Sequence, residues 1–191
     1  MPESTTIFGI AGSIRANSFN RAVLRSAKNL LPDGTELDIF DDLAEVPPFN
    51  EDYELSPPHV VADMKARIRR ADALLFVTPE YNYSVPGVLK NALDWASRPY
   101  GDSAWEGKAA AIMSASPSML GGVRAQHHLR QSFVFLDIRA LNRPEVIITN
   151  AGAHFDGDGI LVDPASRETI RRLLSSLVTW TRQLNAITAA A

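Results

Sequence analysis

The chain has 191 residues, of which 46% are apolar and 21% are charged, a balance that fits one globular domain and excludes a disordered chain. The formal net charge of −3 provides no positive field that would draw the protein to nucleic acid or to anionic membranes. The absence of cysteine excludes disulfides, thiolate metal sites and cysteine nucleophiles.

We expect a cytoplasmic protein without a signal peptide or a membrane span. The opening residues MPESTTIFGIAGS hold no basic region ahead of their short apolar run. No apolar stretch approaches the length that a bilayer requires.

Apolar runs alternate with helical patterns along the chain. The runs that predict strands are residues 5–12, 35–41, 71–79, 108–116 and a segment within 144–149. The patterns that predict helices are residues 19–30, 60–71, 86–98, about 122–136 and a last helix through 170–184. This alternation predicts a three-layer α/β/α sandwich around a five-stranded parallel sheet, with the flavodoxin-like order 2-1-3-4-5. No linker interrupts it, so residues 1–191 are expected to form a single domain.

In a sheet of this kind, ligands bind beyond the carboxyl ends of the strands, near the point where the strand order reverses. The loops after the first, third and fourth strands therefore deserve inspection, and they have the most unusual compositions in the chain. We expect the functional site at these three loops.

The first loop reads GSIRANSFN and leads into a helix. The helix end offers unpaired N–H groups, Ser13, Ser18 and Asn20 offer side-chain donors, and the fork of Arg15 matches phosphate oxygens. The alternative is that Asn17 or Ser18 only caps the helix and that Arg15 is a solvated charge. The loop lacks the lysine of a P-loop and the G-x-G-x-x-G of a dinucleotide site, so a mononucleotide phosphate suits it better.

The other two loops suit a flat ligand. The loop TPEYNYSVP carries two tyrosines and an asparagine between Pro79 and Pro86, which stiffen it. In the loop SASPSMLGG, Gly121 and Gly122 would let the backbone approach a flat ring, and Ser116 could bind it. The alternatives are aromatics that cover the core or contact a second subunit, and an ordinary turn that caps the next helix.

Two long motifs carry a resemblance to a known family. GSIRANSFN resembles the G-S-x-R-x-x-S-x-N phosphate loop of the NAD(P)H-dependent FMN reductases, and PEYNYSVPGVLKNALDW resembles their P-E-Y-N-x-S-x-P-x-x-L-K-N-x-x-D-W signature. LGGVRAQHHLRQSFVFLD is similar to the segment after strand 4 in bacterial quinone, azo-compound and chromate reductases. The likeness covers about residues 5–150, with no departure at the motif positions.

The resemblance implies a flavodoxin-like fold that binds FMN without a covalent bond, in a homodimer or homotetramer with the flavin near a subunit interface. It carries over three groups of contacts: Ser13, Arg15, Ser18, Asn20 and the backbone of Phe19 for the phosphate; Pro79, Glu80, Tyr81, Asn82 and neighbouring Tyr83 for the ribityl chain and the ring; and Ser116 from the third loop.

The activity that follows is hydride transfer from NADPH or NADH to the flavin N5, and then reduction of a small acceptor, by a ping-pong mechanism. Quinones, azo and nitro compounds, chromate, ferric chelates and free flavin are all open as acceptors. No side chain is needed as nucleophile or general base; Glu80 is expected to contact the ring through its backbone or to form a structural pair. Arg124 is a candidate for contacting the cofactor's phosphates or a second subunit.

Two other activities remain open: a flavodoxin-type electron carrier that does not oxidise pyridine nucleotides itself, and a non-catalytic α/β domain whose loops serve assembly. No metal site is expected. Adjacent His127 and His128 diverge on a helix, and DGDG at 156–159 lacks the spaced glutamate of a calcium loop, so it is interpreted as a tight turn within a segment of undefined role at 152–162.

Overall fold

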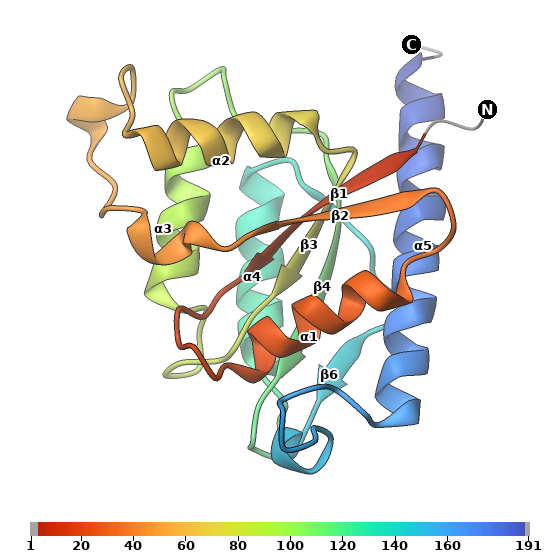
Figure 1. Ribbon diagram of the computed structural model, residues 1–191. Helices are drawn as coiled ribbons and strands as arrows, with labels where there is room; N and C mark the ends of the chain where they lie inside the picture. Colours follow the sequence, from red (N-terminus) through yellow and green to blue (C-terminus); the bar gives the residue numbers. More distant parts are fainter. Residues whose placement is uncertain (1–3, 190–191) are drawn as a thin grey trace.

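Parallel strands form the central sheet of the computed structural model, which describes residues 4–189 (Figure 1). The strands are β1 (Thr5–Ala11), β2 (Thr35–Phe40), β3 (Ala73–Val77), β4 (Ala109–Ala115), β5 (Arg139–Ala140) and β6 (Val146–Ile148). Their order is β2-β1-β3-β4-β5, with β6 also paired with β4. The predicted order 2-1-3-4-5 and the parallel sheet are confirmed.

The fifth position of the sheet holds two short strands where the sequence predicts one. β5 pairs with the first residues of β4, and β6 pairs with the last three. Between them the chain leaves the sheet around Pro144, which has no N–H to donate to a ladder. The prediction of a strand within 144–149 is correct for β6, but a two-residue strand such as β5 shows no pattern of its own.

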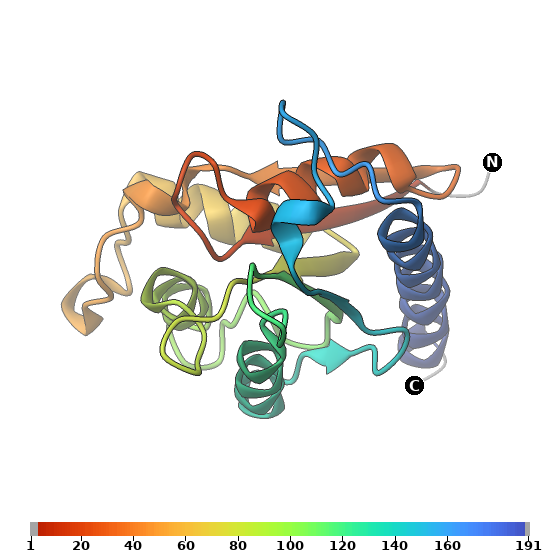
Figure 2. The ribbon, with the colours of Figure 1, turned by 90° about the horizontal axis from the view of Figure 1, so that it is seen from below.

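Helices cover both faces of the sheet. They are α1 (Phe19–Ala27), α2 (His59–Arg70), α3 (Gly87–Ala96), α4 (Val123–Phe135) and α5 (Pro164–Ala189). Figure 2 shows α1 and α5 on one side of the sheet and α2, α3 and α4 on the other. α1 ends before the predicted boundary, because residues Lys28–Leu30 form a 3-10 turn. No helix within residues 4–189 is both long enough and apolar enough to cross a membrane.

Two apolar cores, one on each face of the sheet, join these layers. The strand β3 has the sequence ALLFV and is buried throughout, as expected for a strand covered on both faces. Leu75 and Val77 pack toward the α1 and α5 side, whereas Leu74 and Phe76 pack toward α2, α3 and α4. Because the strands are parallel, the loops after β1, β3 and β4 emerge at the same edge, at the near end of the view in Figure 2.

Candidate cofactor-binding site

The loop after β1 delivers unpaired backbone donors at the start of α1. Ser18 is the N-cap residue of this helix, with extended backbone angles, and its Oγ accepts from the Arg21 amide at 3.5 Å. A helix leaves its first amides without an intrahelical acceptor, so the N–H groups of Phe19 and Asn20 face the loop. Ser13 is buried, and its hydroxyl accepts from the Arg15 amide at 3.4 Å. Ser18 is therefore both the helix cap and a member of a cluster suited to an anion.

Arg15 and Asn20 have different roles in this loop. Arg15 is exposed, and no carboxylate within residues 4–189 pairs with it, whereas Arg21 is paired with Asp41 at 3.1 Å. The buried side chain of Asn20 donates from Nδ2 to the Ala115 carbonyl at 2.8 Å and accepts at Oδ1 from the Ala115 amide at 2.9 Å. Both ends of the amide thus join α1 to β4, and the predicted phosphate contact of Asn20, for which the second Nδ2 hydrogen remains, stays a prediction.

The loop after β3 folds into a tight hairpin at residues 81–84. The amides and carbonyls of Tyr81 and Ser84 exchange two hydrogen bonds of 3.0 Å. Asn82 and Tyr83 have φ angles of 50° and 66°, as a two-residue type I′ turn requires. The Tyr81 and Tyr83 residues are 51% and 65% exposed, so they do not cover the core. A ligand wall or a subunit contact remains as the role of these rings.

Glu80, at the start of this loop, is paired with α4. Its Oε2 accepts from the amides of Arg124 at 3.0 Å and Ala125 at 3.4 Å, and its Oε1 accepts from the Arg124 guanidinium at 3.1 Å. The carboxylate thus caps the start of α4, which agrees with the expected structural pairing. Arg124, in turn, lies with its guanidinium carbon 3.8 Å from the centre of the Tyr83 ring.

Packing within the chain explains the two glycines in the loop after β4. Gly121 and Gly122 have φ angles of 58° and 91°, which favour glycine. A Cβ at Gly121 would overlap the Ile147 side chain, and one at Gly122 would lie 2.9 Å from Ser114 Cβ. These contacts with β6 and β4 explain why glycine stands at both positions, and the close approach of their backbone to a flat ligand stays a prediction. Ser116 is half-buried, and its Oγ lies 3.1 Å from the Ser118 Oγ.

The segment after β6 contributes a wall that the sequence did not predict. A cleft of about 470 Å³ separates the first loop and α1 from residues 152–159, with Arg15 and Arg25 on one side. The rings of Phe19 and Phe155 pack across it at 5.1 Å between centroids. The expected tight turn is confirmed, because Asp156 Oδ1 accepts from the amides two and four residues later. No group of metal-ligating side chains occurs in the described part of the chain.

Comparisons with known proteins identify the family of the chain. Residues 5–153 match a family described as NADPH-dependent FMN reductase. The chain is 48% identical to an NAD(P)H-dependent FMN reductase of Pseudomonas aeruginosa, over 96% of this chain and 99% of that protein. It is 42% identical to a quinone reductase of Pseudomonas putida, over 98% of this chain and 100% of that protein.

A solved structure shares the architecture at a recognisable level of sequence identity. The flavoenzyme NAD(P)H:(acceptor) oxidoreductase FerB from Paracoccus denitrificans matches with a TM-score of 0.86 and 31% identity, over 94% of this chain and 98% of that one. Together with the family match, which covers most of the chain, these relatives establish its membership. The chain belongs to the NADPH-dependent FMN reductase family.

Proposed function

We propose that the protein is an FMN-containing oxidoreductase that passes electrons from NADPH or NADH to quinones or other small acceptors. The observation that carries this proposal is the cluster of donors at the start of α1. Arg15, Ser18 and the start of α1 line one cleft, the Ser13 hydroxyl accepts from the Arg15 amide, and no carboxylate occurs between residues 12 and 20. Such a cluster selects a phosphate, and the relatives carry names of FMN and quinone reductases.

The residues present fit FMN at both of its ends. Its phosphate carries nearly two negative charges, which the helix dipole and Arg15 would stabilise. Its flat ring system needs rigid walls and backbone donors, and the hairpin with exposed Tyr81 and Tyr83 supplies such walls. When bound, FMN supplies the redox chemistry: it accepts a hydride from the nicotinamide and delivers two electrons to the acceptor.

In this proposal the side chains bind and orient rather than react. The first loop would hold the phosphate and the hairpin would form a wall for the ring, and donor and acceptor would use the same site in turn, as the expected ping-pong mechanism requires. Glu80 moves no proton, because its two oxygens are committed to the start of α4. The preference for NADPH or NADH depends on the surface that would face the bound ring. The same surface decides the acceptor, whether quinone, azo or nitro compound, chromate, ferric chelate or free flavin.

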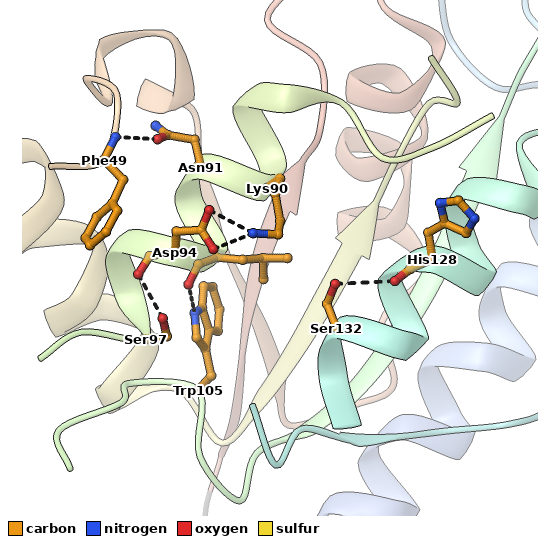
Figure 3. A network of polar contacts seen from close by, with 9 residues as sticks. Phe49, Lys90, Asn91, Asp94, Ser97, Trp105, His128 and Ser132 are labelled. Carbon is orange, nitrogen blue, oxygen red and sulfur yellow. Dashed lines mark hydrogen bonds and ion pairs between the residues drawn. The ribbon is translucent and has the colours of Figure 1, made fainter. Parts of the chain in front are cut away.

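We further propose a homodimer or homotetramer, formed by the single domain of residues 1–191 in the cytoplasm. α3 and α4 cover the same face of the sheet (Figure 2). Val134 and Phe135 at the end of α4 are 83% and 79% exposed, and large exposed apolar side chains favour an interface. The Lys90–Asp94 ion pair of 2.6 Å lies on α3 (Figure 3) and adds a polar contribution there. Sedimentation of wild type and Phe135→Glu tests this: the variant is expected to dissociate.

The experiment that tests the activity is an anaerobic titration of the FMN-loaded protein with NADPH and with NADH. Rapid loss of flavin absorbance is the expected result, and the more effective donor shows the cofactor preference. A bound flavin that stays oxidised with both donors would contradict the proposal and favour an electron carrier. A protein that binds no FMN at all would favour a domain whose loops serve assembly.

A further inference from the structure

Two side chains from one face of α4 hold the hairpin at residues 81–84. The guanidinium of Arg124 stacks on the Tyr83 ring at 3.8 Å, and Nδ1 of His128 lies 3.0 Å from the Ser84 Oγ. Arg124 and His128 are four residues apart, so they lie one above the other on the helix. Figure 3 shows the His128 ring projecting from α4. The hairpin therefore rests on α4 at its turn and at its last residue.

The hairpin needs such support, because little else favours its shape. Only the Tyr81–Ser84 pair bridges it, and a two-stranded hairpin by itself is marginally stable. Tyr83 adopts a left-handed conformation that is unfavourable for a bulky side chain. Without an external contact, this residue would relax toward negative φ, and the turn would open.

Glu80 fixes the position from which Arg124 acts. One carboxylate oxygen caps the amides of α4, and the other accepts from the Arg124 guanidinium. The guanidinium is thereby held by Glu80 at its edge and covered by Tyr83 on its face. A planar guanidinium suits both contacts, since a lysine ammonium pairs with a carboxylate and is attracted to a ring but offers no flat face to stack.

We propose that Arg124 is a positioning residue: stacked on Tyr83 and paired with Glu80, it holds the hairpin in the form that walls the ring-binding side of the site. This inference rests on the proposed function, because the wall matters only if a flavin and its substrates bind there. The consequence is that Arg124 acts on substrate docking through Tyr83.

The first test uses the FMN-free protein and hydrogen exchange at the Tyr81 and Ser84 amides. Arg124→Gln and Tyr83→Leu remove the stack and are expected to speed exchange roughly 3- to 30-fold, the range that a lost cation–π contact allows. Tyr83→Phe keeps the ring and is expected to exchange like wild type, and Arg124→Lys is expected to be intermediate. Tyr53→Leu, at an exposed tyrosine distant in the sequence, is the matched control and should leave these amides unchanged.

The second test measures steady-state kinetics at saturating FMN. We expect Arg124→Gln and Tyr83→Leu to raise the KM for donor and acceptor and to change kcat less. In the double variant, the KM should rise no further than in either single variant. If the Tyr81 and Ser84 amides of Tyr83→Leu exchange at the wild-type rate, Arg124 does not hold the hairpin through Tyr83. If the increases in KM of the two single variants add up in the double variant, the two residues do not act through one stacking contact. Faster exchange with an unchanged KM would overturn the positioning role. If neither NADPH nor NADH reduces the flavin of the wild-type protein, the proposed function is contradicted. The exchange rates would still show whether Arg124 holds the hairpin.

Discussion

Replacing Asn20 by alanine tests how the first loop is held in place. The side chain makes two buried hydrogen bonds, of 2.8 and 2.9 Å, to the carbonyl and the amide of Ala115. Alanine would leave both backbone groups buried without a partner, and each such group costs about 1–3 kcal/mol. Partial relaxation lowers the total, so we expect a loss of roughly 2–4 kcal/mol in the free energy of unfolding. For a chain of this length, that corresponds to a fall in Tm of roughly 4–16 °C.

Urea unfolding of the FMN-free protein measures this loss without interference from ligand binding. Asn17→Ala is the matched control, because Asn17 lies exposed in the same loop and should change the stability by less than about 0.5 kcal/mol. Asn20→Asp should also be destabilised, since a carboxylate accepts from the Ala115 amide but donates nothing to its carbonyl. The reasoning is refuted if Asn20→Ala unfolds like wild type and yet binds FMN poorly, because the side chain would then serve the ligand.

Three further predictions follow from the site and its surroundings. Arg15→Ala removes a charge-assisted phosphate contact of about 1.5–3 kcal/mol, so FMN should bind roughly 10- to 150-fold more weakly by flavin fluorescence, with stability unchanged. Gly121→Ala should destabilise the fold by about 1–3 kcal/mol in urea, because the added methyl meets Ile147 at a positive φ. Hydrogen bonds from Ser166, helped by His154, lower the pKa of Asp163 below 3.8. That carboxylate thus stabilises the fold at neutral pH and loses its effect as the pH falls through its lowered pKa, so the Tm gap between wild type and Asp163→Ala should shrink in acid.

The layers of the fold were predictable because the pattern in each element is local. The apolar runs of β1 and β3 indicate strands covered on both faces, the alternation in β2 indicates a half-buried strand, and the parallel order follows from the intervening helices. β5 was not predictable, because two residues carry no periodicity. Its place depends on the neighbouring strand β4, which supplies its hydrogen bonds.

The site was predictable as a set of loops, but not in the role of every side chain. Asn20 looks like a phosphate donor in the sequence because its partner, Ala115, lies 95 residues further along the chain. The space beside Gly121 is filled by Ile147, a contact that no local pattern contains. Residues 152–159 line the same cleft as Arg15, although they follow the last strand of the sheet and Arg15 follows the first. Such roles arise from packing between distant segments.

The central claim is that the loop after β1 recognises the FMN phosphate, and comparing FMN with riboflavin tests it most directly. Riboflavin carries the same ring and ribityl chain but no phosphate. We expect wild type to bind FMN at least about 100-fold more tightly than riboflavin, and Arg15→Ala to weaken FMN binding while leaving riboflavin binding unchanged. Equal affinities for the two flavins, or an equal effect of Arg15→Ala on both, would contradict it.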